Sequence, residues 1–281
     1  MRNVAAMAIL ISLTAWQSVN AGIMFGTAPF VQGTNSNLYR INEQTGAASL
    51  IGTSGFAEIG GIAFNSAGVL YGYSPGSLYT IDTTTGTATR VGLLGVNAPE
   101  GGLAFQPGTG TLFAVSSTLS DTLLTINPST GVASTVGPLG SAGRDTSGLA
   151  FSPAGVLYGV AFRDGNADQL ITIDTTSGAA SPIGLLGTNV TTPTVGGLEF
   201  DPDSGILYFS DNTNLYTVNT ATGLATLVGP HGVTGMAGLA ATVPEPSTSC
   251  LLCALAFIAS RSFSRGARDA RPSVSKSNQR T

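Results

Sequence analysis

Short apolar runs alternate with polar turns along most of the chain, and the runs follow two recurring patterns. In the first pattern, two apolar segments flank a turn of Pro, Gly, Asn or Ser residues. Its four copies are Gly60–Gly72, Gly101–Ala114, Ser147–Gly159 and Gly196–Phe209. Two short apolar segments on either side of such a turn predict a β-hairpin.

The second pattern also predicts a hairpin, and it occurs as Asn37–Gly52, Ser77–Gly92, Thr122–Gly137, Gln169–Gly184 and Asn214–Gly229. An Asn or Asp follows the first strand of every copy, and a Gly comes four residues later. The Asx side chain can accept hydrogen bonds from the turn backbone, and Gly adopts a positive φ at little cost. These Asx residues are Asn42, Asp82, Asn127, Asp174 and Asn219. We interpret them as turn residues, because the glycine-rich signature of calcium-binding β-helices is absent from the sequence.

The two hairpins together recur with a period typical of β-propeller blades. The second pattern starts at residues 37, 77, 122, 169 and 214, which gives spacings of 40, 45, 47 and 45 residues. Two hairpins at this spacing predict four antiparallel strands per repeat, and blades that pack face to face allow strands that are apolar on both sides. A six-bladed ring would need about forty more residues, whereas a β-helix or an open solenoid would not need a split repeat.

The copies of the two hairpins do not match in number, and this mismatch predicts how the ring closes. The N-terminal segment Ile23–Gly26 matches the second strand of the first hairpin, so the first blade lacks its innermost strand. A matching strand appears at the other end, in Met236–Ala241. This arrangement resembles five-bladed propellers in which the last strand completes the first sheet, a closure that leaves no free sheet edge at the ring ends. We therefore predict an all-β fold, a five-bladed propeller over residues 22–242 with four-stranded antiparallel blades.

Composition supports an all-β body and excludes one class of partner. Charged residues make up 9% of the chain, and glycines number 38. Between Gly22 and Val243 there are four basic and thirteen acidic residues, a balance of 4 − 13 = −9. Nucleic-acid binding needs clustered Lys and Arg, so we expect no nucleic-acid partner for this acidic body.

The N-terminal residues 1–21 have the pattern of a secretory signal peptide. Arg2 precedes an apolar run, Val4–Leu13, and small residues stand at Val19 and Ala21. A basic start, an apolar run and small residues before a cleavage point are typical of export signals, so we expect a short helical leader cleaved after Ala21.

The C-terminal residues 243–281 combine a short box, an apolar segment and a basic tail. The box consists of Val243, Pro244, Glu245, Pro246 and Ser247. An apolar segment at 248–260 follows, and the basic tail at 261–281 begins with Arg261, Arg265 and Arg268. This order resembles the PEP-CTERM sorting signal of exported proteins. The resemblance implies recognition by an exosortase-like enzyme, transient association with the inner membrane, and delivery to the cell envelope or the outside.

The charges of the tail agree with that orientation, but two features depart from the usual sorting signal. Arginines favour the cytoplasmic side of a membrane, which places the body outside. The strictly apolar core Cys250–Ala259 is only ten residues long, whereas a spanning helix needs about 20, and the tail is longer than is usual for the family. We expect a short apolar helix here. The pair Cys250 and Cys253 has metal or redox spacing, but its apolar setting disfavours that use.

The body contains few residues suited to catalysis. It has no Cys or Lys and one histidine, His231, so covalent catalysis by Cys or Lys is excluded and a Ser-His-Asp triad would have to use His231. His231 occupies the register of leucines in sister repeats (Leu94, Leu139 and Leu186). An isolated histidine in a loop is most often solvated, and that is the expectation here.

Three acids form the candidate ligand site, together with His231. Glu58, Glu100 and Asp145 each come shortly before an inner strand, so the propeller topology would place them around one end of the channel, with Arg144 near them. Such a cluster could bind Ca²⁺ or raise one carboxyl pKa enough for acid catalysis on a glycoside. The simpler interpretation is a set of solvated surface acids, because two repeats lack an acid in this register.

These observations favour an exported, non-enzymatic propeller that acts as an interaction module, with no resident metal or cofactor. Its expected partners are the exosortase-like processing enzyme and either exopolysaccharide or envelope proteins, and we expect a monomer. The alternative is a glycan-acting hydrolase or lyase that uses the carboxylates at the channel mouth.

Overall fold

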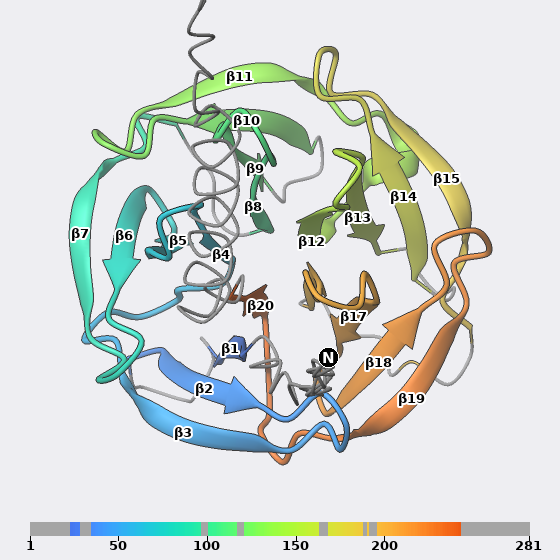
Figure 1. Cartoon of the computed structure of the whole chain (residues 1–281). Helices are drawn as coiled ribbons and strands as arrows, with labels where there is room; N and C mark the ends of the chain where they lie inside the picture. Colours follow the sequence, from blue (N-terminus) through green and yellow to red (C-terminus); the bar gives the residue numbers. More distant parts are fainter. Residues whose placement is uncertain are drawn as a thin grey trace, which may run out of the picture.

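The computed structural model describes residues 23–28, 35–96, 101–116, 121–162, 168–187, 190 and 196–242. Within these ranges, twenty strands form five four-stranded sheets arranged in a ring around a central axis (Figure 1). The ring confirms the predicted five-bladed propeller. The expected leader, sorting box, apolar segment and basic tail all lie outside the described residues.

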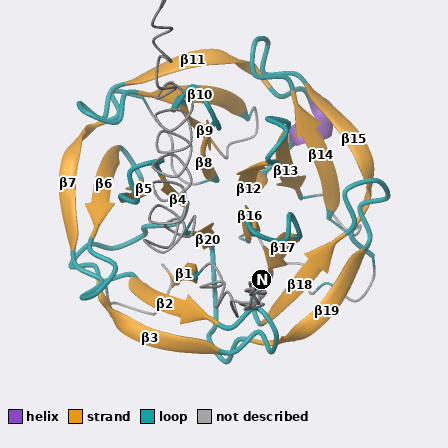
Figure 2. Ribbon diagram, viewed as in Figure 1, coloured by secondary structure: helices purple, strands orange, loops and turns teal. Residues whose placement is uncertain are grey.

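Each blade runs from an inner strand at the channel to an outer strand at the rim (Figure 2). From blade 1 to blade 5, the inner strands are β20 (Gly238–Ala241), β4 (Ile62–Phe64), β8 (Leu103–Phe105), β12 (Thr146–Phe151) and β16 (Gly197–Phe200). The second strands are β1 (Met24–Ala28), β5 (Leu70–Ser74), β9 (Leu112–Ser116), β13 (Leu157–Ala161) and β17 (Leu207–Ser210). The third strands are β2 (Asn37–Ile41), β6 (Ser77–Ile81), β10 (Thr122–Ile126), β14 (Gln169–Ile173) and β18 (Asn214–Val218). The outer strands are β3 (Ala48–Thr53), β7 (Ala88–Leu93), β11 (Ala133–Pro138), β15 (Ala180–Leu185) and β19 (Ala225–Pro230), and a 3-10 turn, η1 (Ser141–Gly143), follows β11.

The first blade is completed by the last strand, as the count of hairpins predicted. Strand β1 pairs antiparallel with β20, with Met24 opposite Ala241 and Thr27 opposite Gly238. Beyond this ladder, the Ile23 N–H donates to the Thr242 hydroxyl at 3.0 Å, and the Thr242 N–H donates to the Ile23 carbonyl at 3.1 Å. Both ends of the described body are therefore held in one sheet.

The repeated Asx residues close the outer hairpin turns. In each turn the Asx Oδ1 accepts the backbone N–H groups two and three residues later, as Asn42 does from Gln44 and Thr45 at 2.9 and 3.0 Å. The Gly at the end of that turn, Gly46, has φ 79°. These contacts confirm that the Asx–Gly spacing is explained by turn geometry.

Glycines and backbone hydrogen bonds join neighbouring blades at the rim. Each outer strand contains a glycine whose added Cβ would meet the turn of the next blade; these are Gly52, Gly92, Gly137, Gly184 and Gly229. Next to these contacts, the first residue of each outer strand donates its N–H to the preceding blade, as Ala133 does to the Leu94 carbonyl at 2.9 Å. The last of these bonds, from Ala48 to the His231 carbonyl at 3.1 Å, closes the ring between blade 5 and blade 1.

The hydrophobic core is divided among the five junctions, that is, the interfaces between neighbouring blades. Each junction contains a cluster of buried apolar side chains contributed by two blades. Burial of both sheet faces explains why the strands lack strict apolar and polar alternation. The junction between blade 5 and blade 1 holds Tyr208, Leu215, Met24, Ile41 and their neighbours.

Candidate binding cavity at the mouth of the channel

The channel is narrowest where the inner strands begin, because glycines there bring the backbones together. A Cβ added to Gly102 would lie 2.2 Å from the Leu149 nitrogen, and one added to Gly238 would lie 2.2 Å from the Gly60 carbonyl oxygen. The equivalent glycines of the other inner strands, Gly61, Gly148 and Gly197, are similarly crowded by the next inner strand. At this end the neighbouring inner strands leave no room between them for a side chain.

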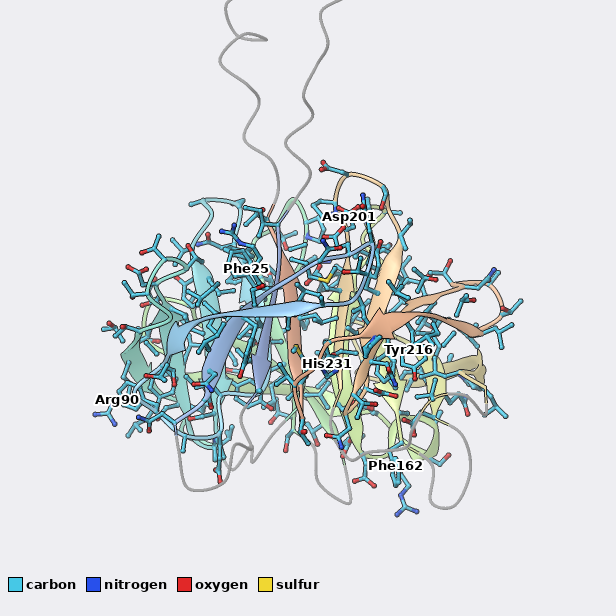
Figure 3. All side chains as sticks on the ribbon, turned by 90° about the horizontal axis from the view of Figure 1, so that it is seen from below. Phe25, Arg90, Phe162, Asp201, Tyr216 and His231 are labelled. Atoms are coloured by element: carbon cyan, nitrogen blue, oxygen red, sulfur yellow. The ribbon has the colours of Figure 1, made fainter. Side chains whose placement is uncertain are left out.

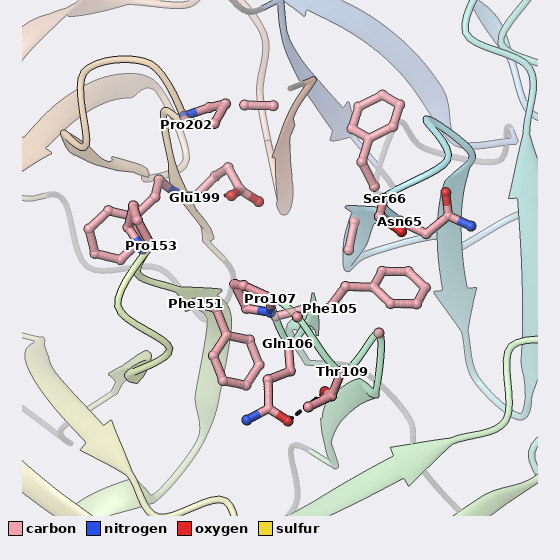
Figure 4. Close-up of a pocket in the computed structure, with 17 residues that line it drawn as sticks. Asn65, Ser66, Phe105, Gln106, Pro107, Thr109, Phe151, Pro153, Glu199 and Pro202 are labelled. Atoms are coloured by element: carbon pink, nitrogen blue, oxygen red, sulfur yellow. Dashed lines mark hydrogen bonds between the residues drawn. The ribbon is translucent and has the colours of Figure 1, made fainter. Parts of the chain in front are cut away.

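The opposite end of the channel widens into a cavity of about 610 Å³. Its wall is made by the ends of the inner strands and by the turns that follow them (Figure 4). The larger lining side chains are the phenyl rings of Phe64, Phe105, Phe151 and Phe200 and the rings of Pro107, Pro153 and Pro202. A volume of this order is typical of sites for small organic ligands.

One carboxyl group, from Glu199, is present among the described residues that line this cavity. Glu199 stands in β16 opposite Tyr208 of β17, and its side chain projects toward the middle of the cavity (Figure 4). One carboxylate oxygen accepts the N–H of Phe200 at 3.1 Å. Burial raises the pKa of Glu199 well above its usual value, because an apolar setting disfavours the charged form.

Four of the five junctions are filled beneath the cavity by an aromatic pair. Each pair joins the end of an inner strand to the second strand of the preceding blade, with ring centroids 5.3 to 5.6 Å apart. The pairs are Phe25–Phe64, Tyr71–Phe105, Phe113–Phe151 and Tyr158–Phe200. At the fifth junction Tyr208 is in place, but Ala241 replaces the phenylalanine and lines the cavity. We call this place, between blade 5 and blade 1, the open junction.

An acidic rim, which we define as Glu43, Asp201 and Asp203, lies beside the open junction. The Glu43 Oε1 atom is buried without a hydrogen-bond partner among the described residues. Burial, and then the charges of Asp201 and Asp203, raise the pKa of Glu43 to about 7. Burial and the charges of Glu43 and Asp201 also raise the pKa of Tyr208. Asp201 is found at one face of the ring, and Phe162 is found at the opposite face (Figure 3).

Two of the acids predicted from the sequence, Glu58 and Asp145, lie at the other end of the inner strands. Glu58 is exposed and Asp145 is partly buried, and they have φ values of 60° and 50° in the same register, where blade 1 has Gly235 at 78°. Both precede the narrow glycine level, so the channel separates them from the cavity. Glu100 lies outside the described residues, and a site formed by the three acids stays a prediction.

His231 is buried, with 3% of its surface exposed, so the expectation of a solvated side chain was wrong. Its Nε2 lies 3.1 Å from the Asp211 carbonyl oxygen, and its Nδ1 accepts the Val233 N–H at 3.3 Å. These contacts require a proton on Nε2. Burial lowers the pKa of His231, which favours the neutral ring. The side chain thus takes the place of the buried leucines of the sister repeats and holds a loop.

The most informative residues of the cavity, Glu199 and Ala241, were missed by the sequence reasoning. The signal was present, because the repeated Gly-Leu-Ala-Phe motif reads Gly-Leu-Glu-Phe at 197–200 and Gly-Leu-Ala-Ala at 238–241. Departures from a repeated motif mark positions where one copy has a different neighbourhood. These two departures could be interpreted only once the structure had shown that the ends of the inner strands form the cavity wall.

Comparison with known proteins supports the fold and goes no further. No family model and no curated protein matches the chain. A chain in the crystal structure of a nidogen–laminin complex aligns with a TM-score of 0.51 at 16% identity and covers 80% of this chain and 99% of its own. A symmetrical protein from work on de novo evolutionary emergence aligns with a TM-score of 0.51 at 22% identity and covers 80% and 100%. The likeness is one of fold.

Proposed function

We propose that this chain is an exported envelope or extracellular-matrix protein whose propeller binds a ligand in the channel-mouth cavity without transforming it. The observation that carries the proposal is the funnel shape of the channel: a glycine level at one end and a cavity of about 610 Å³ at the other. The lining comes from strands and tight turns of all five blades, so the site is preformed.

The chemistry of the cavity suits binding better than glycoside hydrolysis. A glycosidase uses two carboxyl groups on either side of the scissile bond, whereas the described lining offers Glu199 alone. Within the same described part of the chain, no group of three or more His, Cys, Asp or Glu residues could hold a metal ion. The hydrolase alternative relies on Glu58, Glu100 and Asp145, of which Glu58 and Asp145 lie at the end of the inner strands away from this cavity.

Export and sorting are proposed from the terminal sequences. Residues 1–21 have the pattern of a leader, and residues 243–281 resemble a PEP-CTERM signal, which supports an exosortase-like partner and transient association with the inner membrane. Within the ranges given above, no helix has the length and hydropathy needed to cross a bilayer.

The exit of the chain connects the two parts of the proposal. Ala241 lines the cavity, and the neighbouring Ile23 and Thr242 are bonded to each other at the same end of β1 and β20. A body held to a membrane by its C-terminal segment would therefore turn the cavity mouth toward that membrane. Removal of the segment would free the mouth for exopolysaccharide or an envelope protein.

Two measurements test this proposal. Intact mass and cell fractionation of the native protein should show loss of residues 1–21 and of the C-terminal basic tail, with the body in the envelope or the medium. Binding of the purified protein to the organism's own exopolysaccharide and to a panel of envelope proteins should be lost in Ala241→Phe, which narrows the cavity. Retention of the full-length chain in the cytoplasm, or binding that Ala241→Phe leaves unchanged, would count against the proposal.

A further inference from the structure

Three departures from the repeat coincide at the open junction. Glu199 stands where the other inner strands have alanine, namely Ala63, Ala104, Ala150 and Ala240. Ala241 stands where they have phenylalanine, and Glu43 occupies a turn position that is Thr83, Pro128, Thr175 or Thr220 in the other blades. The repeat therefore changes in volume and in charge at one of its five junctions.

The change in volume puts an alanine where the other junctions have a phenylalanine. At the other junctions the second-strand aromatic residue packs on a phenylalanine. At the open junction the second-strand residue is Tyr208, and the position of the phenylalanine is taken by Ala241, whose short side chain forms part of the cavity wall. Ala241 and Glu199 both line the cavity.

Side-chain oxygens of two neighbouring turns accept bonds within those turns, whereas Glu199 has one oxygen without a bond among the described residues. The Asn65 Oδ1 accepts the N–H groups of Ala67 and Val69 at 3.0 and 2.8 Å. The Gln106 Oε1 accepts the Thr109 hydroxyl at 2.9 Å, drawn as a dashed line in Figure 4. Glu199 receives one N–H bond on one oxygen, so within the described part of the chain its second oxygen is left as a charged acceptor for a ligand.

The charges around the cavity have one sign. The described lining contains a carboxyl group and no Lys, Arg or His, and the acidic rim adds Glu43, Asp201 and Asp203. A carboxylate removed from water is stabilised when a cation pairs with it. Phenyl rings attract cations to their faces, and a field of negative charge raises the local concentration of cations.

We propose that the channel-mouth cavity binds a small organic cation, a protonated amine on an apolar body, with Glu199 as its counter-ion and the phenyl rings around its body. This inference rests on the proposed binding function and names the class of ligand. A neutral ligand would leave Glu199 without a counter-ion, and the side-chain oxygens of Asn65 and Gln106 are already bonded within their turns. An anion would face an unpaired carboxylate.

Benzylamine, benzyl alcohol and benzoate form a matched set of probes that share one ring and differ in charge. With the purified full chain, calorimetry or ligand-observed NMR should show benzylamine binding about tenfold more tightly than benzyl alcohol, as a charged hydrogen bond in a sheltered site allows. Benzoate should bind more weakly still. The preference for benzylamine should grow as the pH rises, because ionised Glu199 is the form that pairs with it.

Two variants and one control assign the effect to Glu199. Glu199→Gln keeps the shape and should erase the difference between amine and alcohol, and Glu199→Ala should do the same with the alanine that four sister strands already contain. Asp82→Asn is the control, since it removes one exposed negative charge at a turn where three blades have Asn. It should leave all three affinities unchanged.

The outcomes separate this inference from the proposed function. Equal binding of benzylamine and benzyl alcohol, or a preference that survives in Glu199→Gln, would overturn the cation inference while leaving a cavity that binds ligands. Absence of binding by every probe at millimolar concentration would overturn it as well. If the unaltered protein binds neither exopolysaccharide nor envelope proteins, that result contradicts the proposed function, whatever the three probes show.

Discussion

Replacing a glycine at the blade rim should destabilise the fold, and the distances to the next blade indicate by how much. A Cβ added to Gly92 would lie 2.0 Å from the carbonyl oxygen of Thr130 and 2.9 Å from its carbon. Ordinary contact lies near about 3.5 Å, so the shortfall is about 1.5 Å. Both neighbouring atoms belong to the backbone of the next blade, and a turn held by its own hydrogen bonds cannot move aside as a side chain would. Gly92→Ala must therefore push two blades apart.

The expected loss is at the upper end of the range for overpacking, about 3 kcal/mol. For a body of this size, that corresponds to a fall in Tm of about 6 to 12 °C. The matched control is Gly60→Ala, because a Cβ at Gly60 meets nothing within 4 Å and blade 1 has Ala237 in that register. Its free energy of unfolding should stay within about 1 kcal/mol of the parent.

Urea and thermal unfolding, followed by circular dichroism, provide the assay. Gly92→Ala should unfold at a lower urea concentration and a lower temperature than Gly60→Ala. If the two variants have the same Tm and urea midpoint, the close approach of the blades is not what restricts position 92 to glycine. If Gly60→Ala is the less stable of the two, the space beside Gly60 is too small for a methyl group.

Three further changes test the buried groups of the body. Burial, and then the charge of Asp211, raise the pKa of Asp168 to about 7 from an ordinary 3.8, so the fold loses stability as the pH rises from about 4 to about 7. Asp168→Asn should remove that loss, by up to about 4 kcal/mol in urea unfolding at pH 8, and an unchanged pH profile would contradict it. The lowered pKa of His231 acts in the opposite sense, since stability falls as the pH drops through the unfolded value of about 6.5. His231→Leu should flatten this acid-side slope between pH 7 and 5, and a parallel slope would refute the assignment. Ala241→Phe should raise the free energy of unfolding by about 1 to 3 kcal/mol by packing a ring on Tyr208, and a lower Tm would mean that the open junction is too small for a ring.

Much of the fold could be predicted because its determinants are local in the sequence. The Asx residue and the Gly four positions later define the outer turn, and both act within that turn. The pairing of β1 with β20 followed from the motif that Ile23–Gly26 lacks and Met236–Ala241 supplies. The outer-strand glycines were visible too, but each contacts the turn of a different repeat, and for Gly229 that turn belongs to the first blade, so the contact could not be derived from one repeat.

The candidate site was predicted less well, for a physical reason that His231 and Glu199 illustrate. Both are polar replacements of an apolar residue in one repeat, and their surroundings differ. His231 is enclosed between its own loop and the turn after β17, where its ring bonds the backbone of Val233 and Asp211. Glu199 lies at the end of an inner strand, where the packing of two blades leaves space in front of it. Spacing within the sequence does not distinguish these cases.

The sequence by itself determined the blade, the number of blades and the way the ring closes, because turns and strand periodicity depend on neighbours along the chain. The tertiary structure alone decided at which end of the inner strands the described cavity lies. That outcome depends on side-chain volumes contributed by five inner strands at once: glycines draw their first halves together, and alanines, phenylalanines and Glu199 shape the other end. The meeting of Glu43, Glu199 and Ala241 at one junction exists only when the last strand has closed the first blade.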